Sequence, residues 1–196
     1  MAGTSGGAIV AALYAMHRDA SLLAGLVRTL DWVPMMDFRS NPFIVIENGI
    51  RISTQEGWCD PKPLHDFLLE QTAYATFADI DMDLKVTATD LQSGTLKMFS
   101  RDTTPMVKVA DAVRASTSIP FVYPPMQIGG RAYVDGGVMR DIPANLLPND
   151  GTDAICVYLT GHRKPTPYTH KLYQVASLTF NAILESQHVL DRKSVV

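Results

Sequence analysis

The sequence lacks the features on which membrane-spanning, disulfide-rich and nucleic-acid-binding proteins depend. It contains no run of about 18 apolar residues, so no segment is predicted to cross a membrane. Its two cysteines, Cys59 and Cys156, make no CxxC pair, and we expect both to be buried free thiols. The formal net charge of −3 offers nucleic acid no electrostatic attraction. No EF-hand-like acidic loop is present, and neither a metal nor a cofactor is predicted.

What is present is the pattern of a single α/β domain over residues 1–196. The length suffices for one domain, and 46% of the residues are hydrophobic. Helical and extended patterns alternate, so we expect a three-layer sandwich with a central, mostly parallel sheet between helices. Periodicity predicts helices or strands at 20–30, 84–89, 95–99, 106–116, 154–159 and 168–190. The helix at 106–116 is expected to turn Met106, Val109, Ala110 and Val113 inward.

A glycine-rich motif, Gly3-Thr4-Ser5-Gly6-Gly7, opens the chain and matches the pattern G-x-S-x-G. A nucleophilic serine sits on a tight strand-to-helix turn that crowds its neighbours, and we predict that Gly3 and Gly7 must be small for this reason. Gly6 leaves room for backbone N–H groups to face a substrate, and the following helix turns its positive end toward Ser5. The alternative is a glycine-rich helix start that holds a phosphate, although the lysine of a Walker-type loop is absent.

A serine hydroxyl needs a base to take its proton, and Asp135 is the stronger candidate. It follows an apolar strand and precedes two glycines, which let the chain turn sharply and keep side chains away from the carboxylate. The alternative is an ordinary aspartate in a tight turn, which Asp-Gly commonly marks. Among the five histidines only His162, in the loop after strand 154–159, is well placed for a Ser–His–Asp triad.

Residues 31–50 carry many apolar side chains without a helical or strand period. We interpret this segment as an irregular, mobile apolar flap beside the pocket. It is expected to contact lipid, with Met35, Met36 and Phe38 as binding residues, because exposed apolar patches of this kind mark interaction sites. Ordinary core packing is the alternative interpretation.

Several segments, in order along the chain, resemble those of the patatin-like phospholipases. Gly3 to Gly7 looks like the nucleophile elbow of that family, and Asp135-Gly136-Gly137 looks like its Asp-Gly-Gly/Ala motif. Residues 88–94, 114–125 and 135–143 are similar to further segments that recur in the family. The resemblance implies a central sheet between helices, a Ser5–Asp135 dyad that works without histidine, and acyl esters of lipids as substrates.

One part of the family pattern is missing, because only Met1 and Ala2 precede the motif where these enzymes carry a glycine-rich oxyanion loop. We therefore expect a domain truncated at its N-terminus, with the C-terminal end as a second candidate for truncation. The Gly6 N–H group and the helix end would remain as oxyanion donors, and the loss of one donor typically costs about 10²–10³ in rate. Strands left without a neighbour pair readily with another chain, so a homo-oligomer with Ser5 near the contact is expected.

The sequence thus predicts a lipid acyl hydrolase, a phospholipase or esterase that works through an acyl-enzyme intermediate. Two alternatives remain open. One is an acyltransferase with the same dyad, and the other is a degenerate, non-catalytic protein that binds lipid or a protein partner. We expect a lipid or ester substrate, peripheral contact with membranes and no nucleic-acid partner. The expected location is cytoplasmic or membrane-peripheral, unless a targeting segment lies upstream of residue 1.

Overall fold

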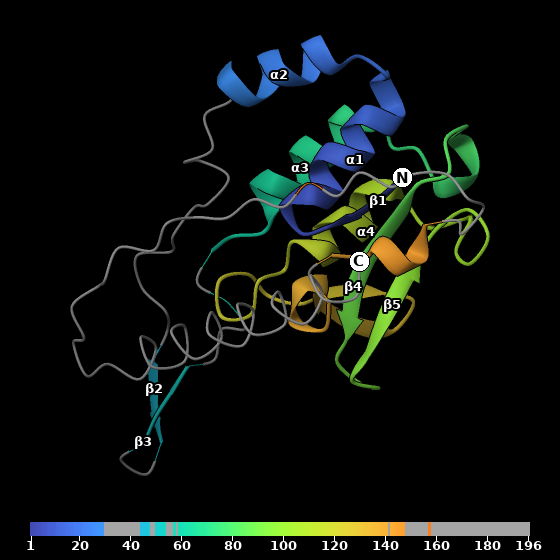
Figure 1. The fold of residues 1–196 in the computed structure, drawn as a ribbon. Coiled ribbons are helices and arrows are strands. Elements are labelled where there is room, and N and C mark those ends of the chain that lie inside the picture. Colours follow the sequence, from blue (N-terminus) through green and yellow to red (C-terminus); the bar gives the residue numbers. More distant parts are fainter. Residues whose placement is uncertain are drawn as a thin grey trace.

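A five-stranded sheet and the helices packed on it form the body of the structure (Figure 1). The structure is a computed structural model, and it describes residues 1–29, 44–47, 50–53, 57, 59–140, 142–147 and 157. The helices within these ranges are α1 (Gly6–His17), α2 (Ala20–Thr29), α3 (Lys62–Gln71) and α4 (Val109–Ser116). The strands are β1 (Ala2–Thr4), β2 (Ile44–Glu47), β3 (Ile50–Ser53), β4 (Lys85–Asp90), β5 (Thr95–Phe99), β6 (Met126–Ile128) and β7 (Arg131–Asp135). Short 3-10 turns are η2 (Phe77–Asp79), η3 (Gly136–Val138) and η4 (Ala144–Leu146).

The strand β4 organises the sheet because three other strands pair with it. The first half of β4 pairs in parallel with β1, and its second half pairs antiparallel with β7. Strand β5 runs antiparallel along β4 from Val86 to Asp90, and β6 pairs antiparallel with β7. Strands β2 and β3 form a separate antiparallel hairpin.

The strands β1 and β7 therefore meet end to end along one edge of β4. A strand has two hydrogen-bonding edges. Strand β5 occupies one edge of β4 from Val86 to Asp90, so β1 and β7 pair one after the other along the opposite edge. Strand β1 runs with β4 and ends at Thr4, which lies opposite Thr87. Strand β7 runs against β4 and ends at Asp135, which lies opposite Ala88. The C-terminal ends of β1 and β7 therefore lie next to each other, opposite the consecutive residues Thr87 and Ala88 of β4.

The α/β class is confirmed, but the expectation of a mostly parallel sheet is wrong for the described strands. Only β1 and β4 pair in parallel there, and the other pairings of this sheet are antiparallel. Tight turns at Gly94 and at Gly129-Gly130, all with positive φ, produce the β4–β5 and β6–β7 hairpins. A hairpin joins neighbouring strands antiparallel, so these turns decide the pairing.

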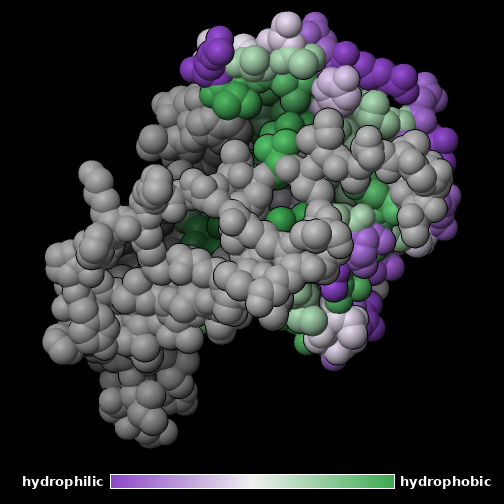
Figure 2. All heavy atoms as spheres, viewed as in Figure 1, coloured by the Kyte–Doolittle hydropathy of each residue, from purple (hydrophilic) through white to green (hydrophobic). Residues whose placement is uncertain are grey.

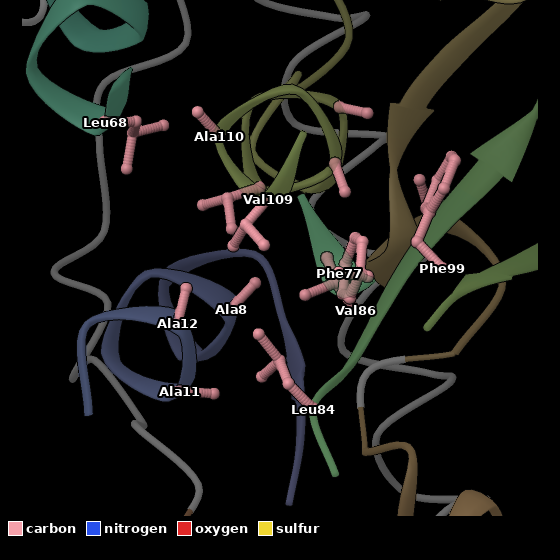
Figure 3. Close-up of a cluster of buried hydrophobic side chains, with 14 of the residues drawn as sticks. Ala8, Ala11, Ala12, Leu68, Phe77, Leu84, Val86, Phe99, Val109 and Ala110 are labelled. Atoms are coloured by element: carbon pink, nitrogen blue, oxygen red, sulfur yellow. The ribbon is translucent and has the colours of Figure 1, made fainter. Parts of the chain in front are cut away.

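The core lies between the sheet and helices α1, α3 and α4. Figure 3 shows Ala8 and Ala12 of α1 directed toward Val109 of α4, and the small alanine side chains let the two helices approach closely. On β4 the side chains of Val86 and Ala88 are buried in this cluster. Thr87 and Thr89, which alternate with them and point to the opposite face, are also buried. Both faces of β4 are therefore covered, as in the interior of a sandwich.

Helix α2 matches the predicted helix at 20–30, but it is only partly covered. Leu23 is buried, whereas Leu22 and Val27 are about half exposed at 51% and 49%. Figure 2 shows hydrophilic residues along much of the outer rim of the described surface and hydrophobic residues farther in. Among the described helices, none has both the length and the apolar character that crossing a membrane requires.

Two sequence-based predictions of local structure are wrong. Met106 is 79% exposed rather than inward, because α4 begins only at Val109, after a backbone bridge joins Lys108 to Thr76. The segment 31–50 is not irregular throughout, since residues 44–47 form β2 and residue 50 begins β3. Cys59 is buried, as expected. Cys156 and the segments 154–159 and 168–190 lie outside the described residues, apart from Val157.

Candidate active site

Ser5 stands on a strained turn between β1 and α1. Its backbone has φ 53° and ψ −128°, a combination that residues other than glycine rarely adopt. A serine in front of a helix usually caps it with its hydroxyl, but the Ser5 side chain makes no capping hydrogen bond. The strain and the uncapped hydroxyl are both features of a nucleophile elbow, in which the turn presents the serine Oγ to a partner away from its own backbone.

The glycines around Ser5 have different steric roles. A Cβ on Gly3 would lie 2.5 Å from the carbonyl oxygen of Gly7, so residue 3 must be glycine for the turn to close. Apart from the backbone of α1 itself, a Cβ on Gly7 or on Gly6 would meet no described residue within 4 Å. The prediction that Gly7 is needed to avoid a collision is therefore wrong. The backbone of Gly7 fills the space beside residue 3, and the turn can close because Gly3 has no side chain.

This difference predicts opposite effects for two matched substitutions. Gly3→Ala is expected to lower the free energy of unfolding by roughly 1–3 kcal/mol, the usual cost of forcing extra atoms into a packed site. Gly7→Ala is expected to keep or slightly raise the melting temperature, since alanine in a helix with negative φ restricts the unfolded chain. Thermal unfolding of both variants beside the wild type is the measurement. Equal losses of stability in the two variants would contradict the geometry of the turn.

The backbone and the carboxylate of Asp135 both make hydrogen bonds. The residue is 4% exposed. Its backbone N–H donates to the carbonyl oxygen of Ser118 at 3.0 Å, and its own carbonyl oxygen accepts from the Thr89 hydroxyl at 2.9 Å. Its Oδ1 accepts from the backbone N–H of Gly137 at 2.8 Å. Residue 136 must be glycine here, because a Cβ would lie 2.6 Å from the carbonyl oxygen of Thr87.

The second carboxylate oxygen of Asp135 meets Ser5. The Ser5 Oγ donates to Asp135 Oδ2 at 2.6 Å, across a sequence separation of 130 residues. The contact follows from the sheet, because β1 delivers Ser5 and β7 delivers Asp135 to the same point on the edge of β4. A short hydrogen bond from a hydroxyl to a carboxylate that is fixed in place is the geometry in which the carboxylate can accept the hydroxyl proton.

The first turn of α1 leaves backbone donors beside this pair. The Ser5 N–H donates to the Ser116 hydroxyl at 2.8 Å, and the Ala8 N–H donates to the Ser5 carbonyl oxygen at 2.9 Å. The N–H groups of Gly6 and Gly7 have no hydrogen-bond partner among the described residues, and both glycines are exposed. These two donors lie at the positive end of the helix, where negative charge is favoured.

Comparison with known proteins identifies the fold and the family. The family model for patatin-like phospholipase matches residues 1–148. The chain belongs to the patatin-like phospholipase family. The resemblance seen in the sequence motifs is thereby confirmed.

Three proteins similar to this patatin-like chain carry names that describe them as uncharacterized. An uncharacterized protein of Bacillus subtilis is 30% identical over 166 residues, which cover 76% of this chain and 57% of the relative. An uncharacterized protein of Acanthamoeba polyphaga mimivirus is 27% identical, with coverage of 62% and 41%. An uncharacterized NTE family protein of Mycobacterium tuberculosis is 29% identical, with coverage of 80% and 24%. The chain thus spans about a quarter to rather more than half of the length of these relatives.

The structure also adds residues to the patatin-like site that the sequence patterns did not single out. These are Ser116 and Ser118 at the end of α4, and Thr89 on β4, all of which bond to Ser5 or Asp135. The segment Arg114 to Pro125 resembles a family segment, but nothing in the local pattern distinguishes its serines from helix-capping residues.

Several other predicted site residues lie outside the described part of the chain. They are His162, Met35, Met36 and Phe38, and their predicted roles stay predictions. Among the described residues, no group of three or more His, Cys, Asp or Glu side chains is arranged to hold a metal ion.

Proposed function

We propose that this chain is a lipid acyl hydrolase in which Ser5 is the nucleophile and Asp135 its base. The observation that carries the proposal is the 2.6 Å hydrogen bond from Ser5 Oγ to Asp135 Oδ2, made by a serine on a strained turn. Family membership supports the lipid hydrolase class. The dyad, the carboxylic-ester substrate and the acyl-enzyme intermediate are parts of the proposal.

In the proposed reaction Asp135 accepts a proton and passes it on twice, once in each half of the reaction. Ser5 Oγ attacks the carbonyl carbon of an ester while its proton passes to Asp135, and the carbonyl oxygen becomes an oxyanion. As the intermediate collapses, Asp135 gives the proton to the departing alcohol, and the acyl group stays on Ser5. Water then attacks the acyl carbon and transfers a proton to Asp135. That proton returns to Ser5 Oγ when the carboxylic acid leaves.

In this proposal, the N-terminal end of α1 binds the oxyanion that forms in each step. The N–H groups of Gly6 and Gly7 are exposed, and the helix adds a positive partial charge there. Donors fixed in advance at the place where charge develops contribute strongly to catalysis. The Ser5 N–H is excluded from this role, because its hydrogen is engaged by Ser116.

The test of the proposal is covalent labelling with a fluorophosphonate, which reacts with an activated serine. We expect stoichiometric labelling, with the adduct found by mass spectrometry on the peptide that contains Ser5. Turnover of short p-nitrophenyl esters and of phospholipid vesicles should accompany it, and an added alcohol acceptor should not divert the acyl group from water. Absence of labelling at Ser5 would overturn the proposal in favour of a non-catalytic protein, and efficient transfer to the alcohol would favour an acyltransferase.

Contact with lipid is proposed for the apolar residues Met35, Met36 and Phe38 on the basis of their sequence alone. Changing all three to serine is expected to weaken binding to phospholipid vesicles while the melting temperature stays close to that of the wild type. Leu91→Ser, at a residue 51% exposed on the described surface, is the matched control and should leave vesicle binding unchanged. A large drop in melting temperature would indicate core packing instead, because truncating buried residues of this size costs about 2–5 kcal/mol each.

A further inference from the structure

The C-terminal end of α4 contacts both members of the Ser5–Asp135 pair. Ser116, the last residue of the helix, accepts a hydrogen bond at 2.8 Å from the backbone N–H of Ser5. Two residues later, the carbonyl oxygen of Ser118 accepts the backbone N–H of Asp135 at 3.0 Å. Within the described residues, Ser5 and Asp135 thus share one helix end as a common support, in addition to the pairing of β1 and β7 with β4.

The Ser5 backbone needs an acceptor at this point. Strand β1 ends at Thr4, so the Ser5 N–H is no longer part of the sheet, and it precedes the first hydrogen-bonded turn of α1. A non-glycine residue at φ 53° is strained by about 1–3 kcal/mol and persists only where its surroundings hold it. Ser116 is 0% exposed, so its hydroxyl has little access to water as an alternative partner.

A buried arginine fixes the helix end that carries Ser116. The Arg114 side chain is 1% exposed, and its Nη1 donates to the Ser118 hydroxyl at 2.6 Å while Nη2 donates to the Pro124 carbonyl oxygen at 3.3 Å. The guanidinium also lies over the Tyr123 ring, 4.7 Å from its centroid. Burial lowers the pKa of Arg114 to about 10, so the group stays charged at neutral pH. A buried cation with these contacts ties the turn after α4 to the helix.

We propose that Ser116 is a positioning residue for the nucleophile. Its hydroxyl holds the Ser5 backbone in the strained conformation from which Oγ reaches Asp135. The inference rests on the proposed function for its effect on catalysis, but the hydrogen bond that it invokes can be measured without any activity. Ser116 itself is fully buried, and we infer that it acts through the Ser5 backbone.

The test compares Ser116→Ala with Thr117→Val. Thr117 is the next residue, and its buried hydroxyl donates to the Val113 and Arg114 carbonyl oxygens rather than to either member of the pair. Ser116→Ala should lower kcat for p-nitrophenyl esters, and the rate of fluorophosphonate labelling, by roughly 10- to 100-fold, as small misplacements of reacting groups do. KM should stay within about twofold, because the substitution removes no group proposed to bind the substrate. Ser116→Cys offers a weaker acceptor and should fall between alanine and wild type.

Amide hydrogen exchange followed by NMR supplies the independent readout. The Ser5 amide should exchange at least about tenfold faster in Ser116→Ala than in wild type, because its buried acceptor is gone, and should be unchanged in Thr117→Val. Equal exchange at Ser5 in the two variants, or a fall in kcat in Thr117→Val as large as in Ser116→Ala, would overturn the inference. If the wild type neither labels nor turns over, the proposed function fails, and the exchange difference alone then decides whether Ser116 holds the turn.

Discussion

Replacing Ser5 with alanine is expected to reduce hydrolysis of p-nitrophenyl esters by more than about 10⁴-fold, in line with other serine hydrolases that lose their nucleophile. Fluorophosphonate labelling should disappear with it. The effect is large because Ser5 Oγ is the group that forms the acyl-enzyme in the proposed reaction. The fold should persist, since Asp135 keeps its hydrogen bond from the Gly137 N–H and its backbone bonds to Ser118 and Thr89.

Steady-state kinetics, intact-protein mass spectrometry after labelling, and circular dichroism check this result together. Ser21→Ala is the matched control, because Ser21 is an exposed serine on α2, and its activity should equal that of the wild type. Retention of wild-type turnover in Ser5→Ala would remove Ser5 from the mechanism and with it the proposed function.

Asp135→Asn is expected to lower kcat by roughly 10²–10⁴-fold, the range attributed to general acid–base catalysis. Asparagine has nearly the shape of aspartate, and its side-chain oxygen can still accept the Gly137 N–H. Its amide group cannot take a proton from Ser5, and its NH₂ would donate to Ser5 Oγ instead of accepting from it. The loss should therefore appear in the chemical step, with the melting temperature little changed.

Two further variants sharpen this comparison. Asp111→Asn removes a carboxylate that pairs with His65 at 2.8 Å, between α3 and α4, and should leave turnover unaffected. His162→Ala should retain most of the activity if Asp135 alone is the base. A loss in His162→Ala as large as that in Asp135→Asn would replace the dyad with a Ser–His–Asp triad.

Much of the local structure could be predicted from sequence because its signals are local. The glycine pattern around Ser5 predicted a tight turn into a helix, and the strained φ of Ser5 agrees with it. The short strand β1 that leads into this turn was not expected. The alternation of residues 84–89 predicted β4 to within a residue at each end. The role of Gly7 was misjudged, since a pattern of glycines does not tell whether a side chain or the backbone does the crowding.

The arrangement around the pair could not be predicted in the same way. The contacts of Ser5 with Asp135 and with Ser116 join residues more than 100 positions apart, and they depend on the register of β1 and β7 on β4. The alternation of helices and strands favoured a mostly parallel sheet. The turns at Gly94 and Gly129-Gly130 are visible in the sequence and favour antiparallel pairs, but they received less weight in the prediction. Ser116 escaped notice because its partner is a backbone N–H, which no side-chain pattern reveals.

The end-to-end meeting of β1 and β7 on β4 has a consequence for how the chain acquires its chemistry during synthesis. Ser5 and Asp135 are separated by 130 residues, and the strand that aligns them lies between the two. At about 5–20 residues per second, roughly 7–26 s pass between the synthesis of the serine and that of the aspartate. Closing a loop of this length costs about 4 kcal/mol of chain entropy beyond a constant, which only the finished sheet can offset. A nascent chain that has made β1, α1 and β4 thus carries the serine but has no base for it.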